Sequence, residues 1–412
     1  MRTWIKVLSR AGLAVALLGV QDIASAGGFA INTQSTSALG NAFAGSAAAA
    51  EDASTIWYNP AGMVRLPGTQ VSVTGHAIKT SFKYQDGGST GAFASPGTGE
   101  GGDGGGLAFV PQAYASFTLD DRWKAGIAFN TPFGLKTEYD DGWRGQFAAL
   151  KSEVQAFNLN PSVAYAIDKT WWVGAGVSYQ RLSTELTNFA GGLGTAKLEA
   201  DDTGWGYNLG VMFNASEATR VGLAYRSQIS YKLKGNATFS GNSAADSGAQ
   251  ADLTVPETAS LGVFSSISPE WDLMGGATWT RWGRLQSFAI TRTSDGSTIT
   301  TLPFKWRNTV LLAAGANYKP NDEWKIRAGV AYDPAVSNDE TRTPRLPDQS
   351  RWVLSFGARY TAGKSDSFDF AYSHDFIKDA NINTTVAGVP GALVGSFKSS
   401  ADILSAQYNH QF

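Results

Sequence analysis

Apolar and polar residues alternate with a period of two along most of this 412-residue chain, from about Gln70 to the last residue. Successive side chains of a β-strand point to opposite faces, so each alternating segment would carry one apolar and one polar face. Between Trp123 and Phe129, for example, apolar residues occupy every second position, and Lys124 and Gly126 lie between them. Segments of this kind are typical of β-barrel walls, which contact lipid on one side and a wet lumen on the other.

About fourteen such segments can be counted, and their connections alternate between short and long. An even strand number with short turns at one end and long loops at the other is typical of outer-membrane barrels. The sequence therefore predicts an all-β fold, a 14-stranded antiparallel transmembrane β-barrel. The predicted strands cover approximately residues 70–83, 108–119, 123–131, 156–166, 171–187, 204–215, 219–238, 253–267, 271–291, 304–318, 324–333, 351–361, 367–378 and 395–412.

The N-terminus has the three parts of a cleaved secretory signal. Arg2, Lys6 and Arg10 form a basic region, residues 11–20 form an apolar run, and residues 24–26 read Ala-Ser-Ala, a typical cleavage site. The apolar run is too short to span a bilayer as a helix. We therefore expect export and a mature chain that begins at Gly27.

Composition agrees with a barrel in the outer membrane of a Gram-negative bacterium. The chain has no cysteine, 13 Trp, 14 Tyr and 22 Phe, and only 17% charged residues, which suits strands that face lipid with aromatic residues at the interfaces. The last strand ends in Phe412, the usual signal for the barrel-assembly machinery. A formal net charge of −2 gives no indication of a nucleic-acid partner.

One stretch fits neither the signal nor the strands. Residues 27–63 read GGFAINTQSTSALGNAFAGSAAAAEDASTIWYNPAGM, which is too rich in Ala and Gly for a strand pair and too apolar for a plain linker. If the strands close into a barrel, this stretch lies at or inside its mouth. We therefore expect three parts, namely a signal peptide (residues 1–26), an N-terminal hatch or plug (27–68) and the barrel (69–412).

The same stretch resembles the N-terminal hatch of the FadL-type outer-membrane transporters of long-chain fatty acids and other hydrophobic compounds. The resemblance includes Asn59-Pro60-Ala61, a hallmark of that family, and continues through residues 129–167 and 346–360. It implies a monomeric 14-stranded barrel that takes up hydrophobic molecules by diffusion. Long-chain fatty acids are the first expectation for the substrate, and aromatic hydrocarbons are the alternative.

Two short motifs have both a functional and an ordinary explanation. Pro60 disfavours a helical conformation at Asn59, so this pair either holds the hatch in a fixed shape or forms an ordinary turn before the first strand. Pro132 and Gly134 follow a predicted strand, and neither residue suits the middle of a sheet. They mark either a kink that, by resemblance to the family, opens the wall laterally, or simply the start of the second external loop.

The expected substrate contacts come from resemblance and from exposed apolar residues. Phe29 matches the aromatic residue that the family places near its high-affinity pocket, and Arg181 and Lys305 fall where its members carry basic head-group contacts. Both cations could also be ordinary lumenal residues without a ligand. The loop after the third strand offers apolar residues for a first capture groove: Phe133, Leu135 and Trp143, with Phe147 and Leu150.

No catalytic set, metal site or cofactor is expected. The three histidines, His76, His374 and His410, are far apart in sequence. Two other functions stay open as alternatives, a general porin with a hydrated lumen and a barrel enzyme that acts on lipids. The expected partners are thus a hydrophobic small molecule, outer-membrane lipid and the assembly machinery.

Overall fold

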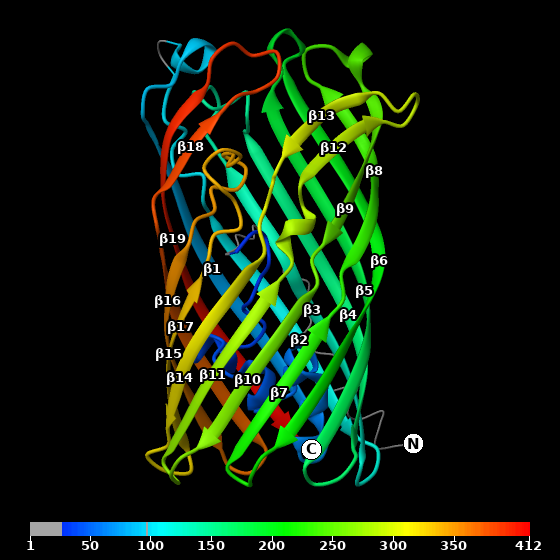
Figure 1. Ribbon diagram of the computed structural model, residues 1–412, viewed down its shortest axis with the longest axis vertical. Coiled ribbons are helices and arrows are strands. Elements are labelled where there is room, and N and C mark those ends of the chain that lie inside the picture. The colour runs from blue at the N-terminus through cyan, green and yellow to red at the C-terminus, as the bar shows by residue number, and fades with distance from the viewer. Residues whose placement is uncertain (1–26, 96–97) are drawn as a thin grey trace.

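The computed structural model describes residues 27–95 and 98–412, so the predicted signal peptide lies outside the described residues. Within them, nineteen strand segments form one antiparallel sheet that closes on itself, because β1 pairs with both β2 and β19 (Figure 1). The segments are β1 (Gln70–Asp86), β2 (Leu107–Thr118), β3 (Trp123–Glu138), β4 (Lys151–Ala166), β5 (Trp171–Phe189), β6 (Thr195–Asn214), β7 (Thr219–Arg226), β8 (Ile229–Phe239), β9 (Ser247–Val255), β10 (Thr258–Ser266), β11 (Trp271–Thr280), β12 (Ser287–Arg292), β13 (Thr298–Pro303), β14 (Thr309–Tyr318), β15 (Trp324–Asp333), β16 (Arg351–Ala362), β17 (Asp366–Ile377), β18 (Ala380–Thr384) and β19 (Leu393–Gln411).

These segments make a barrel of 14 strands within the described part of the chain. Five strands of the barrel are interrupted, so that each consists of two consecutive segments that pair with the same neighbour on at least one side. For example, β7 and β8 both pair with β6. The interrupted strands are β7 with β8, β9 with β10, β11 with β12, β13 with β14, and β17 with β18. The predicted 14-stranded antiparallel barrel is therefore confirmed. Among the described residues, no helix is both long and apolar enough to cross a membrane.

The outer face of the barrel carries an apolar band with an aromatic girdle at each edge. Near the short turns, the girdle contains cross-strand aromatic pairs such as Trp123–Tyr165 and Trp271–Tyr318, with ring centroids 4.6 and 4.8 Å apart. At the other edge lie Tyr179–Trp205, at 4.8 Å, and similar pairs. Between the girdles, outward residues such as Leu223 and Phe370 are more than half exposed. This pattern is that of a barrel wall in contact with lipid.

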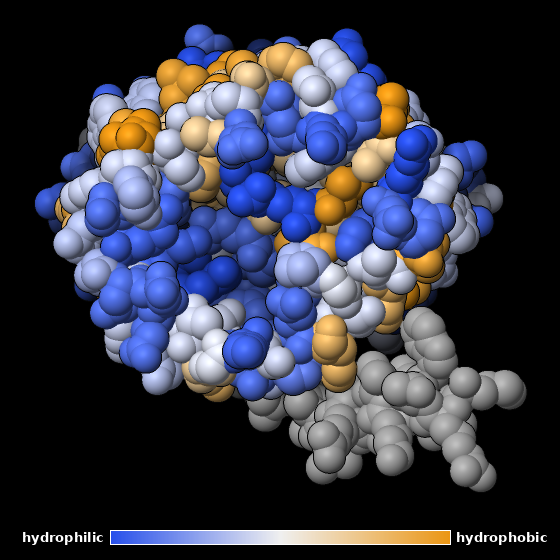
Figure 2. Space-filling view, turned by 90° about the horizontal axis from the view of Figure 1, so that it is seen from below, coloured by the Kyte–Doolittle hydropathy of each residue, from blue (hydrophilic) through white to orange (hydrophobic). Residues whose placement is uncertain are grey.

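Five of the short turns share one local design. An Asp, Asn or Ser at the start of the turn accepts hydrogen bonds from the backbone N–H groups two and three residues later, as Asp120 does from Arg122 and Trp123. The same arrangement occurs at Asp168, Ser216, Ser268 and Asn321. Side chains of this kind can bind local backbone in place of a neighbouring strand. The end of the barrel that carries these turns is hollowed and largely hydrophilic (Figure 2).

Several strands are longer than the sequence predicts. The stretch between Asn188 and Thr203 is not a long loop, because β5 and β6 pair as far as Phe189 and Thr195. These upper parts carry Glu185, Glu199 and Lys197 rather than apolar residues, and the charges pair with each other. Apolar alternation therefore stops where the wall rises past the outer girdle, although the strands continue.

The N-terminal segment, residues 27–66, lies inside the barrel (Figure 1). It contains short helices, α2 (Thr36–Gly40), α3 (Ser46–Ala49), α4 (Thr55–Tyr58) and the 3₁₀ turn η1 (Pro60–Arg65), whereas other 3₁₀ turns, η2 (Gly91–Ala94), η3 (Gly191–Leu193), η4 (Ser243–Ala245) and η5 (Trp282–Arg284), belong to loops and strand breaks. It packs against wall glycines so closely that an added Cβ at any of them would touch it. The contact is with side chains of the segment at Gly126 and Gly210, and includes its backbone at Gly174, Gly222, Gly262, Gly276, Gly315, Gly329 and Gly357.

Buried ion pairs join the same segment to the wall. Glu51 lies 2.7 Å from Arg327 and 3.2 Å from Lys325, and Asp52 lies 3.2 Å from Arg359. Burial opposes the ionisation of Glu51, but Lys325, Arg327 and Arg359 outweigh it and hold the pKa of this carboxyl well below its usual range. Two carboxylates of the segment thus face three cations of β15 and β16, which fixes its orientation in the lumen.

Candidate functional site

The third strand of the barrel is kinked at Pro132. β3 pairs residue by residue with β4 up to Asn130 and again from Phe133, but Thr131 and Pro132 together oppose a single residue, Phe157. An extra residue of this kind bends a strand and breaks its ladder. Pro132 and Gly134 therefore lie within a strand, and the alternative that they begin the external loop is wrong.

The N-terminal segment completes the hydrogen bonds of this kink. The backbone N–H of Ile31 donates to the carbonyl of Pro132, and the N–H of Gly134 donates to the carbonyl of Phe29, both at 2.9 Å. The Gln34 side chain donates to the carbonyl of Thr131 at 3.0 Å. Because buried backbone groups need partners, the kink and the segment stabilise each other.

An apolar cavity of the lumen is lined by residues of β4, β5, β9, β12 and β13, among others; of these, β12 and β13 lie in the upper half of Figure 1. We call it the upper cavity. Its floor is aromatic, because the Phe29 ring lies 5.8 Å from Trp306 and 5.1 Å from Trp282, which is packed beside the cavity. Other apolar residues that line it are Leu135, Val154, Leu186, Leu253, Phe288, Leu302, Phe304 and Leu346.

The loop between β15 and β16, residues 334–350, folds inward and covers one side of the upper cavity. Arg345 reaches across the lumen to Ser152 and Asn188, at 3.0 and 3.2 Å, and to two backbone carbonyls. Burial lowers the pKa of Arg345 to about 10, so the guanidinium stays protonated at neutral pH. Arg342, which also lines this cavity, is paired with Asp339. The loop is therefore a fixed part of the lumen.

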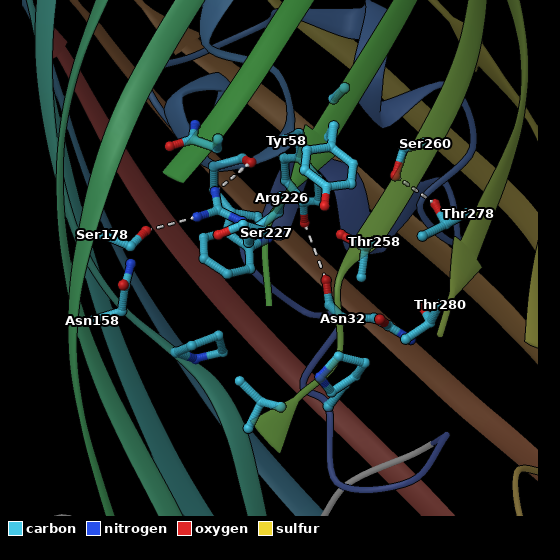
Figure 3. Close-up of a pocket in the computed structure, with 18 of the residues that line it drawn as sticks. Asn32, Tyr58, Asn158, Ser178, Arg226, Ser227, Thr258, Ser260, Thr278 and Thr280 are labelled. Atoms are coloured by element: carbon cyan, nitrogen blue, oxygen red, sulfur yellow. Dashed lines mark hydrogen bonds between the residues drawn. The ribbon is translucent and has the colours of Figure 1, made fainter. Parts of the chain in front are cut away.

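A second, larger cavity lies beneath the first, and residues of the N-terminal segment, including Trp57 and Tyr58 of α4, line it. We call it the lower cavity (Figure 3). Pro132 and Phe133 of the kink line it, and Phe29 separates it from the upper cavity, since Phe29 lines the upper one and Ala30 the lower one. Much of the remaining wall is polar: Asn32, Tyr58, Asn158, Ser178, Gln180, Asn208, Arg226, Ser227, Thr258, Ser260, Thr278 and Thr280.

Three of the expected substrate residues meet at the boundary between the cavities. Phe29 and Leu135 line the upper cavity and Phe133 lines the lower one, and the rings of Phe29 and Phe133 are 5.6 Å apart. Trp143 is elsewhere. It is buried among the external loops, stacks on Tyr139 at 4.3 Å and lines neither cavity.

The two expected head-group cations do not point into either cavity, which corrects the expectation that they lie in the lumen. Arg181 is exposed on the outer face beside Tyr179, and its guanidinium pairs with Asp201 at 3.3 Å. Lys305 lies at the break between β13 and β14 with a φ of 47°, and its side chain is exposed. The neighbouring Phe304 and Trp306 are the residues of that break that turn inward.

Asn59-Pro60-Ala61 forms a fixed corner of the N-terminal segment. The Asn59 amide donates to the carbonyls of Ala47 and Val211, at 2.7 and 3.1 Å. Its oxygen accepts from the backbone N–H of Ala61 at 3.1 Å, and Pro60 begins the turn η1. One side chain thus joins two parts of the segment to the wall strand β6.

Sequence reasoning missed two groups of lumenal residues. Trp282 and Trp306 lie at breaks between strands, where the period-two alternation stops. The sequence therefore could not predict whether their side chains point into the lumen or outward. Arg226 faces the lower cavity from the end of β7. Its parity was informative, because Leu223 and Tyr225 lie on the apolar face, but nothing local distinguishes it from other inward polar residues.

Comparison with known proteins identifies the family. Residues 17–412 match the family model described as outer membrane protein transport protein (OMPP1/FadL/TodX). The chain belongs to this family. An outer membrane protein of Neisseria meningitidis serogroup B is 30% identical, over 97% of this chain and 98% of that protein. A long-chain fatty acid transport protein of Salmonella typhi is 25% identical, over 92% and 94%.

The fold of this FadL-type chain is also that of a solved relative. The crystal structure of a Pseudomonas aeruginosa FadL homologue is similar with a TM-score of 0.86 and 27% identity, covering 93% of this chain and 100% of that one. Together with the barrel, these similarities place the chain in the outer membrane of a Gram-negative bacterium. It is a channel for hydrophobic compounds, in a family of transport proteins.

Proposed function

We propose that this channel takes up long-chain fatty acids. The observation that carries the proposal is the upper cavity, an apolar chamber with an aromatic floor at Phe29. A predominantly apolar lining with a few polar groups is typical of sites that bind small hydrophobic ligands. The fatty acid transport protein of Salmonella typhi, which aligns along most of this chain, supports this substrate class. Aromatic hydrocarbons are the second candidate, because an apolar chamber accepts them equally well.

Uptake by a host without its own channels of this family would test the substrate. Expression of this chain should accelerate the entry of labelled hexadecanoate severalfold over an empty vector. Expression of the Phe29→Asp variant should not, because a carboxylate on the cavity floor opposes an apolar chain. Entry of toluene without entry of hexadecanoate would favour the aromatic-hydrocarbon alternative.

The N-terminal segment acts in this proposal as a hatch that closes the lumen. The wall glycines leave no room between it and the barrel, and Glu51 and Asp52 tie it to wall cations. The stretch Phe29–Ile31 is the part that moves in this proposal. It forms one isolated β-bridge with the wall, between Ala30 and Phe133, rather than a longer ladder. A substrate that displaces Phe29 would join the two cavities.

The kink in β3 serves in this proposal as the lateral exit. Pro132 and Phe133 line the lower cavity from within, and the ladder to β4 is interrupted beside them. A molecule that reaches the lower cavity would leave through this break into the outer leaflet, without crossing the hatch.

Deletion of Thr131 tests the exit. Removing one of the two residues that oppose Phe157 restores one-to-one pairing with β4, so hexadecanoate uptake should fall severalfold while the barrel still folds. Deletion of Gly192, in the exposed turn between β5 and β6, is the matched control and should leave uptake unchanged. Normal uptake after the Thr131 deletion would contradict a lateral route.

The remaining partners follow from the barrel itself. Because β1 pairs with β19 over the whole length of β1, the sheet closes within one chain, and the protein functions as a monomer in this proposal. The terminal strand, which ends in Phe412, would be the segment that the assembly machinery recognises. No enzymatic role is proposed.

A further inference from the structure

The lower cavity contains one cation that has no anionic partner. Of the described residues that line it, Arg226 is the only charged one. Its guanidinium donates to Ser178 Oγ and to the carbonyl of Trp57, both at 3.0 Å, and more weakly to Asn160 Oδ1 at 3.5 Å. Among the described residues, no Asp or Glu lines this cavity and no carboxylate forms an ion pair with Arg226. Its contact with Ser178 can be followed in Figure 3.

The inward arginines of β15 and β16 have carboxylate partners, whereas Arg345, at the upper cavity, binds only neutral acceptors. Arg327 and Arg359 share Asp369 and carboxylates of the hatch, and Arg351 lies 2.8 Å from Asp333. A partly buried cation without a counter-charge is costly unless an anion reaches it. Arg226 is therefore the place in the lower cavity at which a negative charge would be most stable.

The surroundings hold the guanidinium ready for such an anion. Its carbon lies 3.5 Å from the centroid of the Trp57 ring, so the hatch supports one face of the group by a cation–π contact. Ser178 and Trp57 fix it from the wall and from the hatch. The hydroxyl and amide groups around it, such as Ser227 and Thr258, can donate to a second oxygen.

Arg226 lies at the level in the wall at which the charged group of an amphiphile would be when it leaves the barrel through the lateral exit. Its neighbour Tyr225 faces outward and pairs with Tyr207 in the outer aromatic girdle. The kink in β3 follows Phe129, whose ring stacks on Phe157 in the same girdle. In a membrane this girdle lies at the interface between lipid head groups and chains, where the carboxylate of a fatty acid also resides.

We propose that Arg226 binds the carboxylate of an amphipathic substrate in the lower cavity and makes this chamber selective for acids over neutral compounds. The inference rests on the proposed uptake of fatty acids. A charge-assisted, two-pronged contact between a guanidinium and a carboxylate is the interaction that this site offers. The apolar residues of the same cavity, including Ile31, Phe43 and Phe133, then hold the start of the chain.

The test compares an acid with its neutral counterpart. Equilibrium dialysis of the full mature chain in a non-ionic detergent would measure the binding affinities for hexadecanoate and hexadecanol. Arg226→Gln should weaken the binding of hexadecanoate at least tenfold and change the binding of hexadecanol less than twofold. Arg226→Lys should recover most of the lost affinity for hexadecanoate. The upper cavity, which Arg342 and Arg345 line, is the same in wild type and variant, so the change in the ratio of the two affinities between them isolates Arg226.

Arg220→Gln is the matched control. Arg220 lies on the same strand and face, donates to the hatch carbonyls of Ala48 and Ala49, and packs on an aromatic ring at 3.8 Å, but it lines neither cavity. Its replacement should leave the affinity ratio unchanged. Equal loss of both ligands in Arg226→Gln, or unchanged binding of hexadecanoate, would overturn the proposal. Failure of the proposed function is distinct, since wild-type protein would then bind neither compound.

Discussion

At the scale of single residues, the most informative feature is the set of wall glycines around the hatch. They are aligned across neighbouring strands, as Gly222 is with Gly262 and Gly174 with Gly210. Glycine is costly inside a strand, so a belt of glycines at one height requires a reason. The reason here is that the N-terminal segment, mostly through its backbone, occupies the space where side chains would otherwise lie.

Gly222→Ala should loosen the hatch. The new Cβ would overlap the carbonyl of Ala47, which is the acceptor of the Asn59 amide. We expect a measurable ion leak in planar bilayers, and faster cleavage of the hatch by protease. Gly275→Ala is the control, because its Cβ would meet only the carbonyl of Ala313 at 3.7 Å; a leak as large in this variant would contradict the argument.

At the scale of elements, the hatch and the wall strands β15 and β16 are joined by charge. The contact is buried, with the Glu51 side chain 10% and the Arg327 side chain 1% exposed. Removing one partner of a buried pair leaves an uncompensated charge, which is far more costly than the loss of a surface pair.

Glu51→Gln should therefore destabilise the barrel by about 3 kcal/mol, seen as a lower temperature of heat-induced mobility shift in gels. The control, Glu199→Gln, removes a surface pair with Lys197 and should change stability by less than about 1 kcal/mol.

The pKa of Glu51 is depressed in the folded state. Its stabilising contribution is therefore complete above the usual carboxyl pKa and is lost as pH falls through the depressed value. Wild type and Glu51→Gln should converge in acid; an equal gap at all pH values would contradict this.

At the scale of the whole molecule, two cavities in series lie above the N-terminal segment, the proposed hatch. The lumen is interrupted at Phe29 and again at the helices of the N-terminal segment. A barrel of this size without such an insert would conduct ions freely. The arrangement therefore favours gated passage of hydrophobic molecules over general permeation, the alternative that the sequence left open.

Deletion of residues 27–63 should turn the closed barrel into an ion channel. The intact protein should give little steady current in planar bilayers, and the deletion variant a large one. Because Lys325, Arg327 and Arg359 would lose Glu51 and Asp52, the new pore should prefer anions. A large current from the intact protein, or a cation-selective pore after deletion, would contradict the closed arrangement.

Periodicity could also have corrected one of the sequence-based expectations. Arg181 shares its parity with Trp171, Val177 and Tyr179, which face outward. The alternation alone therefore assigned it to the outer face, and resemblance to the family pointed the other way. Lys305 offered no such check, because the strand is interrupted beside it and the parity is lost.

The sequence by itself determined the fold of the protein and its localisation in the outer membrane. Neighbouring residues of each barrel strand alternate between its two faces, so the fourteen strands and their apolar outer face could be predicted from local sequence. Export was predicted from the N-terminal signal. Only the tertiary structure decided what the lumen does. The meeting of Phe29 with Trp282 and Trp306, the place of Pro132 within β3, and the isolation of Arg226 depend on strand register and on where the N-terminal segment rests. Register is fixed by contacts between residues far apart in the chain, and no local pattern records them.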